Sequence, residues 1–87
     1  MDAYKLCWKE SVQKDFRRLP SAIISRVIKK VESLPVNPAP IDSKKLRDTE
    51  HTYRVRVSDY RIIYQVNPVD KEVLICRVRH RKDAYKV

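Results

Sequence analysis

Glycine is absent from this chain of 87 residues. Without glycine there is no glycine-rich loop to cradle a nucleotide phosphate, so nucleotide hydrolysis by that route is excluded. No apolar run approaches the ~20 residues needed to cross a bilayer, so we expect no membrane-spanning segment. The N-terminus, residues 1–5, lacks the basic start and apolar middle of a signal peptide, which favours the cytoplasm.

Cysteine and histidine are also scarce. The two cysteines, Cys7 and Cys76, lie far apart within apolar alternations, so we expect both to be reduced residues of the sheet or core. The two histidines, His51 and His80, are also far apart in the sequence, so no zinc-binding spacing results. Clusters of acidic residues are missing as well. We therefore expect neither a metal-dependent nuclease nor any cofactor.

Acidic residues are few in relation to basic ones. Lys and Arg number 20 and Asp and Glu 11, which gives a formal net charge of +9. This charge on a small chain favours an acidic partner: nucleic acid, an acidic protein or a membrane surface. Apolar residues make up 43% of the chain, too many for a disordered basic tail. We expect one domain over residues 1–87, with a small core and modest stability.

Apolar residues recur in the first half of the chain with two different periods. Alternation over residues 4–8 indicates a strand with one buried face. Spacings of four and three over residues 11–19 indicate an amphipathic helix, which Pro20 ends. Ser21 can cap a second helix, whose apolar stripe continues until Pro35 stops it. Three prolines within residues 35–40 then predict an extended connector.

The second half returns to a period of two. Strands are predicted over residues 52–57, 60–66 and 72–79, with turns between them. The centre of the last strand is apolar on both faces, which indicates an interior strand. The predicted fold class is therefore α+β, in the order strand, helix, helix, strand, strand, strand, followed by a basic C-terminal tail. Short connections make the last three strands an antiparallel meander, with the two helices covering one face of the sheet.

Arginines occupy the face that the helices leave open. Arg54 and Arg56 lie two residues apart and project from one side of their strand, and Arg61 lies near the start of the next strand. These three can converge on the open face, and the basic residues at the end of the last strand extend the patch. Guanidinium groups match phosphate oxygens well. The alternative is that charge here protects a sheet edge from aggregation.

The tail carries the residues best suited to proton transfer. His80 can give or take a proton near neutral pH, and Tyr85 can stack on an unpaired base. Together with nearby cations they suit RNA cleavage, in which the 2′-hydroxyl attacks and cations stabilise the phosphorane. The alternative is that the histidine of a basic tail is exposed and has no role.

These features together resemble the RelE/ParE toxin superfamily, with the RelE branch the more similar. The segments that carry the resemblance are KLR at 45–47, YRVRVSDYRIIY at 53–64 and RVRHRKDAY at 77–85. The order of elements agrees along the whole chain. The resemblance implies the toxin of a type II toxin–antitoxin pair that enters the ribosomal A site and cuts mRNA there without a metal.

The resemblance also assigns residues. By position it implies catalytic roles for Arg54, Arg56, Arg61, Arg81 and Tyr85, and His80 stands where some relatives carry a basic or imidazole group. We expect RNA binding by the neighbouring residues Lys44, Lys45, Arg47, Arg77, Arg79 and Lys82. The implied partners are the ribosome, mRNA and a cognate RelB-like antitoxin, in a hetero-oligomer that binds operator DNA.

The chain departs from the family pattern in two respects. Arg54 and Arg56 replace lysines, and because arginine stays charged in proteins they are poor general bases. We therefore expect them to stabilise phosphate, with His80 in a proton-transfer role. Ser58 and Arg79 replace two glycines common among relatives.

Three other functions remain open. A ParE-like toxin would bind and inhibit DNA gyrase without cutting RNA. A plain basic RNA-binding module would bind without catalysis, and a toxin-like relic would do neither.

Overall fold

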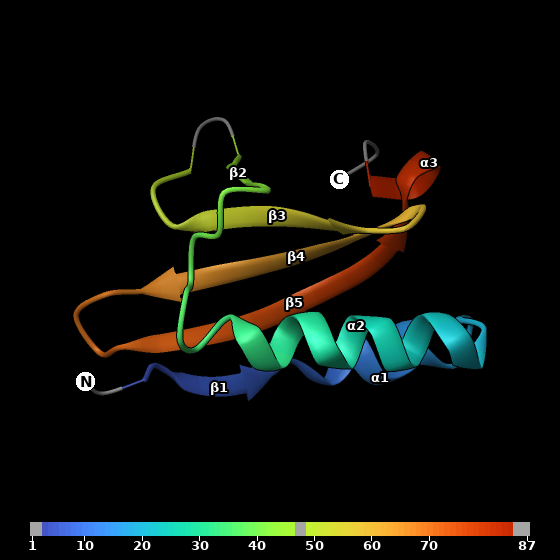
Figure 1. Cartoon of the computed structure of the whole chain (residues 1–87), viewed down its shortest axis with the longest axis horizontal. Coiled ribbons are helices and arrows are strands. Elements are labelled where there is room, and N and C mark those ends of the chain that lie inside the picture. The colour runs from blue at the N-terminus through green and yellow to red at the C-terminus, as the bar shows by residue number, and fades with distance from the viewer. Residues whose placement is uncertain (1–2, 47–48, 85–87) are drawn as a thin grey trace.

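A computed structural model describes residues 3–46 and 49–84, without the side chains of 83 and 84. Its elements are β1 (Lys5–Trp8), α1 (Glu10–Phe16), α2 (Ser21–Ser33), β2 (Ser43–Lys45), β3 (Thr52–Val57), β4 (Tyr60–Asn67), β5 (Glu72–His80) and α3 (Arg81–Ala84). The α+β class and the predicted order are confirmed (Figure 1). Two short elements were not predicted: the edge strand β2, and α3 at the start of the basic tail.

The five strands form one sheet in the order β1-β5-β4-β3-β2. β3, β4 and β5 pair antiparallel in sequence order, so the predicted meander is confirmed. β5 lies between β4 and the parallel strand β1, which explains why its centre is apolar on both faces. β2 adds three residues to the edge of β3, and its sequence SKK has no apolar alternation by which it could be recognised.

One face of the sheet carries the core. Val27 and Val31 of α2, and Leu34 directly after it, are fully buried against strand residues that include Val55 and Ile62. Figure 1 shows α2 running along the sheet, with the short α3 at the far end of β5. We call the opposite face, which carries Arg54 and Arg61, the open face.

Helix α1 lies along the edge of β5 beyond the point where β1 ends. β1 ends opposite Ile75, and beyond that point the backbone of β5 has no strand partner on this side. The hydroxyl of Ser11 donates to the Cys76 carbonyl at 3.0 Å, and the Asp15 carboxylate accepts the Val78 N–H at 3.0 Å. These side chains satisfy backbone groups that a longer strand would have paired, and they fix the end of β5.

Two tight turns are made without glycine. Ser58 in the β3–β4 turn and Lys71 before β5 have φ values of 54° and 52°. This left-handed conformation costs a residue with a Cβ roughly 1–2 kcal/mol. The Nε of Arg56 donates to the Ser58 carbonyl at 2.7 Å and so ties the first turn to the open face.

Both cysteines are free, as predicted. Cys76 is buried and Cys7 is half-buried. Burial raises the pKa of the Cys76 thiol above its ordinary value, so the neutral thiol is favoured.

Candidate RNA-binding site on the open face

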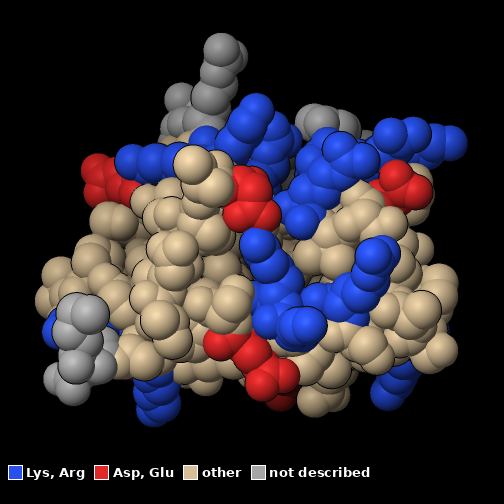
Figure 2. All heavy atoms as spheres, in the orientation of Figure 1, with Lys and Arg blue, Asp and Glu red and all other residues tan. Residues whose placement is uncertain are grey.

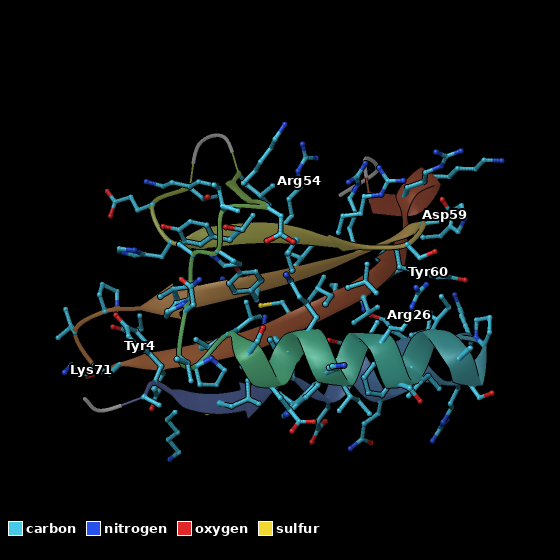
Figure 3. All side chains as sticks on the ribbon, viewed as in Figure 1. Tyr4, Arg26, Arg54, Asp59, Tyr60 and Lys71 are labelled. Carbon is cyan, nitrogen blue, oxygen red and sulfur yellow. The ribbon has the colours of Figure 1, made fainter. Side chains whose placement is uncertain are left out.

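The arginines expected on the open face are brought together by strand register. Arg56 of β3 lies opposite Arg61 of β4, and Arg61 lies opposite Arg79 of β5. One row further along, Lys44 of β2 lies opposite Arg54. Residues paired in register share a face of the sheet, so these five cations lie on the same side. Figure 3 shows Arg54 projecting from β3 on the side away from α2.

Most of these side chains line a pocket of about 300 Å³. Its lining residues are Asp42, Lys44, Arg54, Arg56 and Arg61. Among the described residues, four cations thus line the pocket together with one carboxylate. Figure 2 shows Lys and Arg side chains gathered over the upper half of the molecule, above β2 and β3, with few acidic residues between them. Such a pocket suits an anion with several oxygens.

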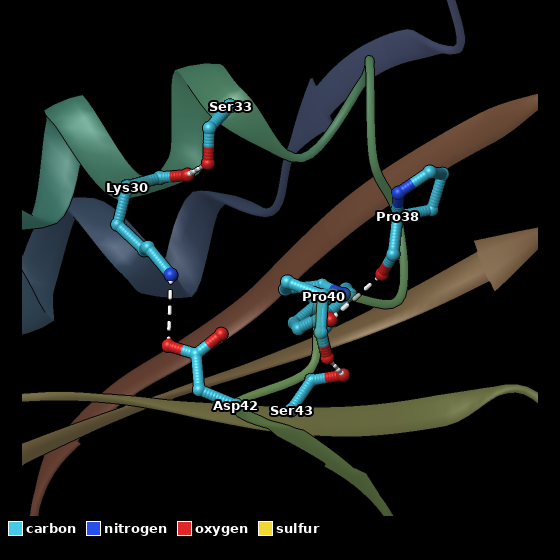
Figure 4. Close-up of polar contacts among 7 residues, drawn as sticks. Lys30, Ser33, Pro38, Pro40, Asp42 and Ser43 are labelled. Carbon is cyan, nitrogen blue, oxygen red and sulfur yellow. Dashed lines mark hydrogen bonds and ion pairs between the residues drawn. The ribbon is translucent and has the colours of Figure 1, made fainter.

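The single carboxylate is already engaged. Asp42 Oδ2 lies 2.8 Å from Lys30 Nζ of α2 (Figure 4). This hydrogen bond to Lys30 holds the pKa of Asp42 below its ordinary value, so Asp42 is ionised at neutral pH. The pair also joins α2 to the segment before β2. Close by, Tyr64 donates to the Pro38 carbonyl at 2.8 Å and secures the proline connector.

Arg77 and Arg79 face a different acid. Arg77 Nη1 and Arg79 Nε lie 3.9 and 3.8 Å from Asp15 Oδ1. Asp15 is buried, with 6% of its surface exposed. This carboxylate therefore holds three groups at the end of β5, namely the two guanidinium groups and the Val78 N–H.

His80 lies on the other face of the sheet. It pairs in register with Tyr60, in the row that continues from Ile62 and Val78 toward the helices. Its ring meets that of Tyr60 edge-on at 5.3 Å, and its Nδ1 accepts the Lys82 N–H at 3.3 Å. A cavity of about 130 Å³ beside it is lined in part by Asp15. The structure thus does not bring His80 together with the arginines of the open-face pocket.

The remaining expected site residues lie at the periphery. Arg81 is the first residue of α3, exposed, and its N–H donates to the Asp59 carbonyl of the β3–β4 turn at 2.7 Å. Lys82 and Lys45 are exposed. Arg47 and Tyr85, both expected to act on RNA, lie outside the described residues.

Three residues that shape the site were not identified from the sequence. Asp15 stands on the apolar side of α1, three residues after the buried Val12. An acidic residue within an apolar stripe could have indicated this role, since a buried carboxylate needs hydrogen-bonding or charged partners. Lys30 and Asp42 gave no signal, because the proline connector separates them.

The described part of the chain lacks two other kinds of feature. No helix there is long and apolar enough to cross a membrane. No three His, Cys, Asp or Glu side chains in those residues lie together as metal ligands would.

Comparison with known proteins identifies the class. Residues 6–85 match the family model described as the ParE toxin of type II toxin–antitoxin systems. The chain is 32% identical over 85 residues to toxin RelE3 of Methanocaldococcus jannaschii, covering 93% of this chain and 94% of that protein. It is 30% identical over 89 residues to the mRNA interferase toxin RelE of Escherichia coli, covering 95% and 90%. The chain is therefore a toxin of a type II toxin–antitoxin system.

Solved structures agree with this assignment. The archaeal RelE–RelB complex of Pyrococcus horikoshii contains a chain that superposes with a TM-score of 0.80 at 33% identity, covering 91% of this chain and 96% of that one. The RelB–RelE complex of Methanococcus jannaschii gives 0.77 at 28% identity, covering 92% and 95%. The chain belongs to the RelE/ParE toxin superfamily and is a RelE-like toxin.

Proposed function

We propose that this toxin is a metal-independent endoribonuclease that cuts mRNA in the ribosomal A site. The observation that carries the proposal is the pocket formed by Arg54, Arg56 and Arg61 on the open face. The relative named an mRNA interferase supports it. The pocket is polar, cationic and open to one side, as a site for an RNA backbone must be.

The proposed reaction needs charge stabilisation above all. The 2′-oxygen forms a bond to the adjacent phosphorus, the bond from phosphorus to the 5′-oxygen breaks, and a 2′,3′-cyclic phosphate remains. One proton leaves the 2′-hydroxyl and one is delivered to the 5′-oxygen. The phosphorane between these steps carries additional negative charge, and we assign its stabilisation to Arg54, Arg56 and Arg61.

Proton transfer is assigned to other groups, because an arginine keeps its proton in proteins. His80 and Tyr85 remain the proposed contributors from the tail, together with Arg81. Arg81 lies next to the β3–β4 turn, at the end of the sheet where Arg56 faces Arg61. Because His80 lies on the helix-covered face, we expect it to contribute less to proton transfer than its imidazole chemistry alone suggests.

We also propose a RelB-like antitoxin as the partner, as in the complexes of the relatives. A net charge of +9 favours an acidic segment that folds on binding. Covering the open face would block the arginine pocket. The resulting hetero-oligomer is expected to bind operator DNA.

Primer extension on a defined mRNA, with purified ribosomes and the purified toxin, tests the proposal. We expect cuts within A-site codons. Arg61→Ala should lower cleavage by at least the ~10²-fold typical of losing one transition-state donor, whereas Arg17→Ala, an exposed arginine at the end of α1, should cleave like the wild type. Arg81→Ala should also lose cleavage, and His80→Ala should retain more than Arg61→Ala. Intact message with the wild-type toxin refutes the proposal.

The alternative is inhibition of DNA gyrase, which the ParE name of the matching family model favours. A gyrase supercoiling assay with the same preparation distinguishes the two. Loss of supercoiling activity together with uncut mRNA would make the ParE-like function the correct one.

A further inference from the structure

A second cationic groove lies between α2 and the end of β3. Its volume is about 600 Å³, and its lining residues are Arg26, Lys29, Lys30, Ser33, Arg56, Val57 and Ser58. Nothing in the proposed cleavage reaction uses the residues that α2 contributes. We call this surface the α2 groove.

The α2 part of the groove is a concentrated stripe of positive charge. Arg26, Lys29 and Lys30 follow the helix spacing of three and four residues, so they share one side of α2. That side lies next to the buried one, which carries Val27 and Val31. Figure 2 shows Lys and Arg side chains over the region of α2 as well, below those gathered above β2 and β3.

Most of this charge is uncompensated. Lys30 is paired with Asp42. Among the described residues, no acidic side chain lies within ion-pair distance of Arg26 or Lys29, and both are exposed. Like charges at this spacing destabilise a helix by a few tenths of a kcal/mol. A bound anion would remove that repulsion.

The α2 groove adjoins the arginine pocket. Arg56 lines both. The ion pair of Lys30 with Asp42 joins them a second time, since Lys30 lines the groove and Asp42 lines the pocket. A linear polyanion bound at the pocket can therefore pass Arg56 and continue along α2. Figure 3 shows Arg26 on the side of α2 nearer the β3–β4 hairpin.

We propose that the α2 groove binds the phosphodiester backbone of RNA, next to the nucleotides held at the arginine pocket. This inference rests on the proposed function insofar as RNA is the ligand of both sites. A docked antitoxin helix fits less well, because such a helix needs an apolar groove and Val57 is the one apolar residue among the described lining residues. Repeated phosphates match a row of separate cations.

Binding measurements on RNA of two lengths test the groove without using cleavage. A trinucleotide and a decanucleotide are used, with every 2′-hydroxyl methylated so that neither can be cut. Even at the roughly 3.4 Å per phosphate of a stacked duplex strand, the longer probe is comparable with the 34 Å length of the molecule, and an extended single strand is longer. The double variant Arg26→Gln, Lys29→Gln removes two groove cations. Lys14→Gln, Arg17→Gln removes the same charge from exposed positions of α1 and its end.

Affinity and its salt dependence are both expected to separate the variants. The wild type and the α1 control should bind the decanucleotide more tightly than the trinucleotide. The groove variant should not show that gain, and the magnitude of its slope of log K against log salt should fall by about 1.4, or ~0.7 for each phosphate that is no longer neutralised. Equal decanucleotide affinity in the groove variant and the wild type overturns the inference. So does a wild type with no gain from length.

The source of the RNA is resolved by pelleting the toxin with ribosomes. A loss by the groove variant on message-free ribosomes assigns the groove to ribosomal RNA, and a loss only on programmed ribosomes assigns it to mRNA. Either result supports the groove as an RNA site. If the wild type binds the decanucleotide more tightly than the trinucleotide but does not cleave mRNA, the nuclease proposal is refuted and the groove proposal is not.

Discussion

The replacement of Asp15 tests how the end of β5 is held. Asp15 is the buried acid of α1, and its Oδ2 accepts the Val78 N–H at 3.0 Å. Asp15→Ala leaves that N–H without its acceptor and removes the carboxylate that faces Arg77 and Arg79. Asp15→Asn keeps an oxygen acceptor and removes the charge. The two variants therefore separate the hydrogen bond from the ion pairs.

The structure gives the expected loss in the free energy of unfolding. A hydrogen bond to a charged acceptor contributes about 1.5–3 kcal/mol. The ion pairs add little, because their closest approaches are 3.8 and 3.9 Å and the arginine side chains are 25% and 37% exposed. We expect Asp15→Ala to cost about 2–3 kcal/mol and Asp15→Asn about half of that. A chain of 87 residues has a total stability of roughly 4–13 kcal/mol, so the loss is large.

Urea unfolding followed by circular dichroism measures the loss. All variants carry Arg61→Ala, so that cells survive their expression. In thermal unfolding of the same variants, each kcal/mol lowers Tm by roughly 4–8 °C, so a cost of about 2–3 kcal/mol lowers Tm by about 8–24 °C. Gln13→Ala, an exposed position of the same helix, should stay within about 0.5 kcal/mol of the parent. If Asp15→Ala does so too, the account of α1 as the support of β5 is wrong.

Two further variants address stability elsewhere. Tyr64→Phe loses the hydrogen bond to the Pro38 carbonyl and should cost about 1 kcal/mol in urea unfolding. Burial raises the pKa of Tyr64 above its ordinary value near 10. The stabilisation that Tyr64 provides is therefore complete below pH ~10 and is lost as the pH rises through the folded-state pKa. If the Phe variant loses as much stability at alkaline pH as the parent does, this reasoning is wrong. Lys71→Gly relieves the left-handed conformation and should gain roughly 0.5 kcal/mol after the added chain entropy of glycine. If Lys71→Gly instead lowers the stability, the backbone at Lys71 is not strained as we infer.

Local periodicity predicted the fold well because the elements that carry the core have strong patterns. The alternation over 60–66 and the apolar centre of β5 follow directly from one-sided and two-sided burial. β2 was missed because three polar residues carry no pattern, and its existence depends on backbone pairing with residues 53–55. Pairing between distant segments is a tertiary property that period alone does not encode.

The same limit explains the outcome at the candidate site. Arg54 and Arg56 share a face by spacing alone, and Arg61 joins them because the turn between the strands is short. Alternation puts His80 on the face opposite to Arg79, and the face of Arg79 depends on counting through all of β5. A register shift at Ile63 and Tyr64, where β5 has one residue more than β4, breaks that count. The ring therefore lies toward the helices, although its neighbours in sequence are basic tail residues.

The arrangement of charge links stability, partner and function. Arg56, Arg61 and Arg79 stand side by side on three strands, where like charges directly opposite one another are destabilising. The buried Asp15, 3.8 Å from Arg79, offsets part of this repulsion at one end of the row. A bound polyanion would relieve more of it, and so would an acidic antitoxin segment. If the proposed RNA and antitoxin both bind this face, they compete for the same electrostatic gain, and antitoxin binding there would both block the pocket and stabilise the toxin.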